Sequence, residues 1–342
     1  MLIKTPSDRR TNSGVWNGWQ RLFIAVFFLA GVLVFQGCGA RQKVSSPPQA
    51  TEIRLDNPVN QVIIKIDLPV MDPAKSTTLV FFALPNGNSI EWTEGKKMVA
   101  GDDWHYDIQH IGAQTRYLRQ VMKDQNLVTV YLANRLKSWP AWKRQTPNGP
   151  AEIRRIVDSV TGMFTAYQPS VVLNSHSGGS FIFGYIDAVK TIPDIVERIC
   201  FIDSDYGYED SMHTGKLVQW LSASEKHHLN VLAYNDSVVI YNGKPLVSPT
   251  GGTWYRSKLM QQRLSNSFRF EHSADTAFSR FISPDKRIVF LLKENPEGKI
   301  YHTEQVARNG FIHTLLSGTK YEKKAGYSYW GNRVYDAFIS DK

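Results

Sequence analysis

Cysteine is the scarcest residue type in this sequence, with two in 342 residues, Cys38 and Cys200. Cys38 closes an apolar N-terminal segment, so a single thiol remains for the rest of the chain. Cys200 stands in the apolar stretch 199–202, where a lone cysteine behaves as a small buried hydrophobic residue. A disulfide framework and a zinc site built on cysteines are therefore excluded. Histidine and aspartate do not repeat the spacing of a known ligand set, so we expect no metal and no cofactor.

The sequence also lacks repeats of solenoid length and compositionally biased segments. Its formal net charge is +9, of which residues 1–37 contribute +3 through four Lys or Arg and one Asp. The basic residues form no stripe and no nucleic-acid-binding motif occurs, so nucleic acid is not an expected partner. A moderately basic chain of this kind suits an anionic envelope surface or acidic glycans.

No apolar run is long enough for an ordinary membrane-spanning helix. The longest extends over 22–35, follows four basic residues within 1–21, and has the length of a signal-peptide core. It leads to Gly37 and Cys38, and this junction resembles the lipobox of bacterial lipoproteins. Phe35-Gln36 departs from the residues usual there.

The lipoprotein resemblance implies a signal peptide at 1–37, a lipidated Cys38, and a polar tether at 38–58. Gly39 after the cysteine, in place of aspartate, is associated with the outer membrane in such proteins. The resemblance thus implies a bacterial cell-envelope protein that meets the membrane through an N-terminal lipid. An uncleaved N-terminal anchor remains the alternative, and it would tether the same domain.

From residue 59 to 342, apolar runs alternate with segments of helical periodicity. Strands are expected at 61–68, 77–84, 127–133, 171–173, 196–202, 229–234 and 287–292, and helices at 107–123, 150–167, 181–189 and 303–316. This alternation predicts one α/β domain with a doubly wound, mainly parallel sheet and helices on both faces. Stretches 206–228 and 237–284 are expected as insertions, and a lid is one role for the second.

The apolar strand at 171–173 leads into Ser-His-Ser-Gly-Gly at 175–179, and a helix follows. Strand, tight turn and helix around a serine form a nucleophile elbow, in which the turn pushes the hydroxyl out of the backbone. Small residues, here Ser175 and Gly179, let strand and helix pass closely. Ser177 is the predicted nucleophile. The pattern resembles the α/β-hydrolase superfamily, whose usual motif has glycine at the position of Ser175.

The α/β-hydrolase resemblance implies a serine, an acid and a histidine after successive strands, in that chain order. We expect His302, in the loop after the last strand, to be the base, with His313 as the alternative. We expect Asp236, after the penultimate strand, to be the acid. Asp203 and Asp205, which follow the strand before it, are the alternative acids.

The same resemblance implies two backbone amides that hold an oxyanion. One is Gly178, directly after the predicted nucleophile. The other is Gly87 or Asn88, in the turn that follows the strand at 77–84. Asn-Gly at 86–87 is also an ordinary turn signal, so a plain turn stays open as the alternative.

The function implied by the resemblance is hydrolysis of a carboxylic ester through an acyl-enzyme on Ser177, with a small-molecule or glycan ester as substrate. A serine peptidase or amidase acting on envelope substrates is one alternative. A non-catalytic binding protein on a hydrolase scaffold is the other. The fold does not choose among them, because one scaffold hosts many functions.

Overall fold

The computed structural model describes residues 51–57 and 59–341. The predicted signal peptide, Cys38 and most of the expected tether lie outside these residues. Within the described part of the chain, no helix combines the length and hydropathy needed to cross a bilayer.

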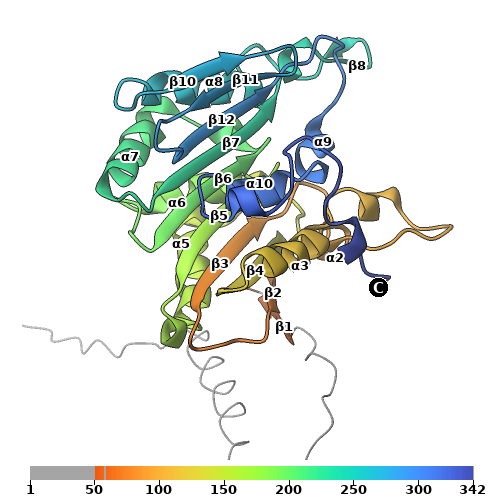
Figure 1. Ribbon diagram of the computed structural model, residues 1–342, viewed down its shortest axis with the longest axis vertical. Helices are drawn as coiled ribbons and strands as arrows, with labels where there is room; N and C mark the ends of the chain where they lie inside the picture. The colour runs from red at the N-terminus through yellow and green to blue at the C-terminus, as the bar shows by residue number, and fades with distance from the viewer. Residues whose placement is uncertain (1–50, 58, 342) are drawn as a thin grey trace, which may run out of the picture. The chain divides into compact units, whose positions relative to one another are not determined.

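A ten-stranded sheet organises the described chain (Figure 1). Its strands are β1 (Thr51–Asn57), β2 (Val62–Leu68), β3 (Ser76–Ala83), β4 (Gln125–Asn134), β5 (Ser170–His176), β6 (Val196–Ile202), β7 (His228–Tyr234), β10 (Glu271–Ala274), β11 (Phe278–Ile282) and β12 (Ile288–Lys293). They lie in the order β1-β2-β4-β3-β5-β6-β7-β12-β11-β10. The central strands, from β4 to β12, pair in parallel, and the strands at both edges pair antiparallel. This is the predicted α/β-hydrolase fold.

Helices cover both faces of the sheet, as Figure 1 shows. They are α2 (Ile90–Glu94), α3 (Ile111–Val121), α4 (Trp139–Gln145), α5 (Gly149–Gly162), α6 (Ser180–Ala188), α7 (Asp210–Ala223), α8 (Thr253–Leu264), α9 (His302–Ala307) and α10 (Gly310–Leu316). Apolar residues of α4 to α8 share one core with the sheet, and those of α3, α9 and α10 share the core on the other face. The central strands are buried on both sides, which explains their almost continuous apolar runs.

Several elements differ from the sequence-based expectations. Part of the expected tether forms β1, which pairs antiparallel with β2. The helix expected at 303–316 is two helices, because Asn309 between them adopts a left-handed conformation with φ 66°. Residues 139–145, between the strand expected at 127–133 and the helix expected at 150–167, form α4, whose first turn is capped by the Ser138 hydroxyl. The helix expected from residue 107 begins at Ile111.

The stretch 237–284 is largely part of the main fold. It contains a short hairpin of β8 (Ile240–Tyr241) and β9 (Lys244–Pro245), then α8, β10 and β11. The last two strands extend the ten-stranded sheet. The stretch 206–228 likewise contributes α7, whose apolar residues join the core. Since β5, β6, β7 and β12 are parallel neighbours, their carboxyl ends meet at one edge, where sites of such folds lie.

Candidate active site

Ser177 sits in a strained turn between β5 and α6. Its φ is +58°, a value that non-glycine residues adopt rarely. The Gly178 N–H donates to the carbonyl of His176 at 2.5 Å, which closes the turn around Ser177, and the Ser177 N–H donates to Ile202 at 3.2 Å. Strain of this kind persists where the surroundings enforce it, and it clusters at functional sites. We call this strained turn between β5 and α6 the elbow.

The elbow is packed too tightly for side chains at its two glycines. A Cβ on Gly178 would overlap the carbonyl oxygens of Ala83 and Leu84, and one on Gly179 would overlap the carbonyl oxygen of Ser204. These are backbone atoms, so the neighbours cannot simply rotate away. Glycine is required at both positions by this close approach.

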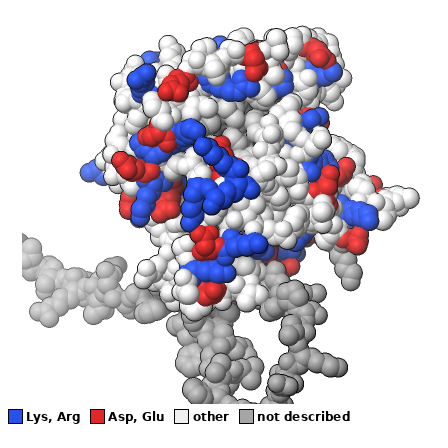
Figure 2. Space-filling model, in the orientation of Figure 1, with Lys and Arg blue, Asp and Glu red and all other residues white. Residues whose placement is uncertain are grey.

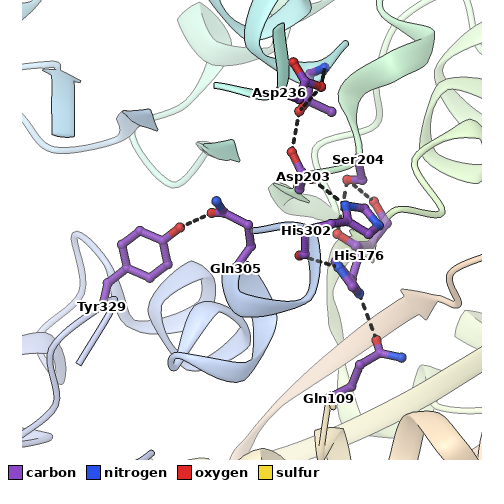
Figure 3. Close-up of polar contacts among 10 residues, drawn as sticks. Gln109, His176, Asp203, Ser204, Asp236, His302, Gln305 and Tyr329 are labelled. Carbon is purple, nitrogen blue, oxygen red and sulfur yellow. Dashed lines mark hydrogen bonds and ion pairs between the residues drawn. The ribbon is translucent and has the colours of Figure 1, made fainter. Parts of the chain in front are cut away.

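Serine at position 175 has a role that glycine could not fill. Its hydroxyl lies 2.8 Å from the hydroxyl of Ser204, which in turn donates to the Ser175 carbonyl at 3.1 Å (Figure 3). Ser204 directly follows Asp203. The pair therefore ties the elbow at the end of β5 to the loop at the end of β6.

His302 and Asp203 are in direct contact (Figure 3). His302 Nδ1 meets Asp203 Oδ2 in a short hydrogen bond, and Asp203 is fully buried. A histidine that donates from Nδ1 to a carboxylate presents Nε2 as a proton acceptor. His302 Nε2 has no partner among the described residues, and the side chain is 26% exposed. His302 can thus accept a proton from a group in the solvent-facing site.

His302 also lies beside the elbow. The ring centroids of His302 and His176 are 4.6 Å apart, and His176 Nε2 is 3.0 Å from the His302 carbonyl oxygen. His176 immediately precedes Ser177. No hydrogen bond joins Ser177 Oγ to His302 Nε2 in the described structure. In unliganded active sites such bonds are often long and shorten only when substrate binds.

His176 is held from both ends and is buried at 2% exposure. Its Nδ1 lies 3.2 Å from Gln109 Oε1, while Nε2 faces His302. Burial lowers the pKa of His176 well below its usual value, so the ring is neutral. His176 thus packs against His302 and makes hydrogen bonds directly before Ser177.

Asp236, the acid expected first, does not contact His302. Its Oδ2 accepts the backbone N–H of Thr253 at 2.9 Å. Thr253 is the first residue of α8, so Asp236 caps that helix. Asp203 occupies the position against His302 that was expected of Asp236. The two residues end neighbouring strands, which is why chain order alone did not separate them.

The remaining alternatives lie elsewhere. Asp205 Oδ2 accepts from the Ser257 hydroxyl at 2.8 Å and makes no contact with His302. His313 on α10 bonds to Tyr327 Oη at 3.0 Å, and burial lowers the pKa of His313 to about 3. The structure thus pairs His302 with Asp203 and places His302 against His176, the residue that precedes Ser177.

The amides expected to hold an oxyanion are already bonded to carbonyls of the protein. Gly87 donates to Lys137 at 2.7 Å and Asn88 donates to Pro85 at 3.3 Å, so the turn alternative describes this loop. Gly178 donates to His176. Two nearby amides, of Asn86 and Gly179, have no acceptor among the described residues.

Three carboxylates are buried at this edge of the sheet, those of Asp203, Asp205 and Asp236. Burial is the main cause that raises the pKa of Asp205 to about 8, and burial with the charge of Asp203 raises that of Asp236 to about 6. Among the described residues, no set of three or more His, Cys, Asp or Glu side chains is arranged to hold a metal ion. Hydroxyls and backbone amides donate to these carboxylates, while Asp205 Oδ1 and Asp236 Oδ1 are buried without a hydrogen-bond partner among the described residues.

Three supporting residues were not found from the sequence. Thr253 lies 50 positions from Asp203, whose Oδ1 accepts its hydroxyl. Gln109 and Ser204 likewise contact residues 67 and 29 positions away. No spacing rule connects such pairs. The one available signal was Gly251-Gly252 directly before a helix, where close approach of another group is common.

The charged surface does not surround this site. Figure 2 shows Lys and Arg gathered on one part of the face in view. Lys323 and Lys324 are exposed in the segment that follows α10, and Lys286 is exposed between β11 and β12. Gly318 of that segment packs against His228, at the amino end of β7. This basic surface therefore lies at the sheet edge opposite to Ser177, and it gives no reason to expect an anionic substrate.

Comparison with known proteins gives a fold likeness only. No family model matches the chain, and no curated protein matches it. Among solved structures, a thermostable esterase shows 13% identity and a TM-score of 0.46, over 79% of this chain and 63% of the esterase. Poly(aspartic acid) hydrolase-1 from Sphingomonas sp. KT-1 is 12% identical with a TM-score of 0.41, over 79% of this chain and 100% of that protein. The siderophore hydrolase EstA from Aspergillus nidulans is 10% identical with a TM-score of 0.40, over 82% of this chain and 99% of that protein. Likeness this weak carries no argument about activity.

Proposed function

We propose that this chain is a serine hydrolase that cleaves carboxylic esters through an acyl-enzyme on Ser177. The observation that carries the proposal is the hydrogen bond from His302 to the buried carboxylate of Asp203, beside a serine held at φ +58°. A serine hydroxyl is a weak nucleophile until a neighbouring imidazole takes its proton. The carboxylate keeps the imidazole in the accepting tautomer and stabilises the imidazolium that forms.

The proposed reaction has two halves. Ser177 Oγ attacks the acyl carbon while its proton passes to His302 Nε2, and the tetrahedral intermediate then expels the alcohol, which takes that proton. Water next attacks the acyl-enzyme while its proton passes to His302 Nε2, and the acyl–Oγ bond then breaks, so that the carboxylic acid leaves and Ser177 Oγ takes the proton back from His302. Each half needs one proton acceptor and one donor, and His302 serves as both in turn.

The oxyanion formed in each half requires hydrogen-bond donors. The unbonded amides of Asn86 and Gly179 are the groups proposed for this role. They replace Gly87, Asn88 and Gly178, whose N–H groups are engaged within the protein. Each such donor typically contributes about 10²–10³ in rate when it is aimed at the developing charge.

A panel of short-chain and aromatic carboxylic esters, with matched amides, tests this function. We expect ester turnover by the wild-type protein and its loss, by at least about 10³-fold, in Ser177→Ala and in His302→Ala. His313→Phe is the matched control, because that histidine is buried away from the site. Amide turnover equal to ester turnover would favour a peptidase or amidase. No turnover of either class would favour the binding-protein alternative.

The N-terminal segment supports a proposal about where the protein is located. We place the domain in the bacterial envelope, anchored through a diacylglycerol on Cys38. The support is the order of basic residues, apolar run and Gly37-Cys38 in the sequence. Cell fractionation of wild type and Cys38→Ala, with the mass of each recovered protein measured, tests it. The variant should lack the mass of the lipid and keep its signal peptide. Equal processing of both proteins, with no lipid on the wild type, would contradict lipidation.

A further inference from the structure

The first turn of α8 is bonded to the buried carboxylates at the carboxyl edge of the sheet. Thr253 Oγ1 is in short contact with Asp203 Oδ1, and Thr253 N–H donates to Asp236. Ser257 donates to Asp205 at 2.8 Å. Residues 253 and 257 are four positions apart and therefore share one face of the helix. This face of α8 holds the ends of both β6 and β7.

The hydroxyl of Thr253 has one hydrogen and two carboxylates within reach. Asp203 Oδ1 is the closer, and Asp236 Oδ2 lies 3.4 Å away. Asp236 Oδ2 already receives the backbone N–H of Thr253. The hydrogen therefore goes to Asp203. Thr253 and both aspartates are at most 1% exposed, and a hydrogen bond to a buried carboxylate is among the stronger kinds.

Asp236 fixes the helix on which Thr253 stands. Its carboxylate lies directly over Gly252, where a Cβ would overlap all three carboxylate atoms. A carboxylate at the N-terminus of a helix satisfies free N–H groups and opposes the positive end of the helix dipole. The two aspartates are thus connected through one threonine, whose backbone meets Asp236 and whose hydroxyl meets Asp203.

We propose that Thr253 is a positioning residue for the Asp203–His302 pair, and that Asp236 acts through it by holding the start of α8. The inference rests on the proposed function, since it assigns Asp203 as the acid. With Oδ2 on His302 and Oδ1 on Thr253, the plane of the Asp203 carboxylate is fixed from both sides. Without the hydroxyl, one buried carboxylate oxygen loses its donor and the carboxylate can rotate away from His302.

Thr253→Val and Thr253→Ser form the matched pair of variants, because valine keeps the shape and serine keeps the hydroxyl. In Thr253→Val we expect kcat for ester hydrolysis to fall about 10- to 100-fold with little change in KM, as for the loss of a hydrogen bond to a charged group. Thr253→Ser should retain most of the rate. A valine variant as active as wild type overturns the inference, as does an equal loss in both variants.

A second readout does not depend on turnover. The Nδ1 proton of His302 should give a low-field proton resonance, assigned by its loss in His302→Ala. It should shift in Thr253→Val and not in Thr253→Ser, and an unshifted resonance in the valine variant overturns the inference. If the wild-type protein hydrolyses no ester, the proposed function fails, and the resonance still decides the role of Thr253.

The role of Asp236 is tested by a double-variant cycle. Asp236→Ala removes the cap, and we expect it to shift the His302 resonance in the same direction as Thr253→Val. The double variant should then shift it no further than Thr253→Val alone, because Asp236 acts through the threonine. Additive shifts would contradict that part of the inference.

Discussion

His302 Nδ1 donates to the carboxylate of Asp203, whereas the carboxylate of Asp236 accepts the backbone N–H of Thr253. The two aspartates follow neighbouring parallel strands and are equally buried. Their hydrogen-bond partners divide their roles, so that one orients the histidine and the other caps α8. This division is the basis of the first prediction.

Asp203→Asn should abolish the proposed ester hydrolysis and Asp236→Asn should not. An amide at 203 cannot stabilise an imidazolium and favours the wrong histidine tautomer, so kcat should fall about 10³- to 10⁴-fold. Asparagine at 236 remains a good helix cap, so we expect a change of less than about 10-fold. Steady-state ester kinetics of both variants measure this. The reverse order of effects would restore Asp236 as the acid.

Gly179→Ala should destabilise the protein and abolish activity. Its Cβ would overlap the Ser204 carbonyl oxygen, so the elbow or the loop after β6 must shift. We expect a loss of about 1–3 kcal/mol in the free energy of unfolding, typical of overpacking, measured by urea denaturation.

Gly215→Ala is the matched control for that variant. Gly215 lies inside α7, is exposed, and leaves open space for a Cβ. Alanine there should stabilise the protein by about 0.5–1 kcal/mol because glycine is a poor helix former. Equal effects of the two substitutions would contradict the close packing described for the elbow.

Stability should depend on pH through Asp205. Its pKa is raised to about 8 in the folded protein, mainly by burial, while the unfolded chain releases this proton near pH 4. Between these values the folded state binds more protons, so the free energy of unfolding falls as pH rises, by up to about 1.4 kcal/mol per pH unit. Asp236, with a pKa of about 6, acts in the same direction up to that pH.

Asp205→Asn removes this dependence and isolates it. Relative to wild type, the variant should gain stability steadily from pH 5 to pH 8 in urea titrations. Buried histidines with lowered pKa values, such as His176 and His313, act in the opposite direction below about pH 6.5, but they are common to both proteins. Asp158→Asn, on the exposed surface of α5, is the control. Parallel curves for Asp205→Asn and wild type would contradict the raised pKa.

Much of the fold could be predicted because the signals are local. Buried parallel strands are continuous apolar runs, and the nucleophile elbow is a contiguous pentapeptide between a strand and a helix. The extra strands were missed because both are short, β10 is exposed throughout, and β11 mixes polar with apolar residues, so neither contains an apolar run. The break at Asn309 was missed because it depends on side-chain bonds to Ser328 and Asn332, which follow it in the chain.

The site was predictable only as far as chain order reaches. The chain order of the elements pointed to Ser177 and to His302 as candidates. Asp203 and Asp236 both follow parallel strands, so only three-dimensional contacts tell these two apart. Asp203 accepts from His302 and from the Thr253 hydroxyl, whereas Asp236 accepts the Thr253 backbone N–H, and both partners lie far along the chain. Backbone amides are equally invisible in sequence, so the engagement of Gly87 and Asn88 in a turn could not be foreseen.

The most direct test of the account is covalent labelling of the purified domain with a fluorophosphonate, followed by peptide mapping of the adduct. The account predicts one phosphonylated residue, Ser177, with labelling lost in His302→Ala and in Asp203→Asn and retained in Asp236→Asn. A well-folded wild-type protein that takes up no label, or an adduct on another serine, would contradict the claim that Ser177 is an activated nucleophile.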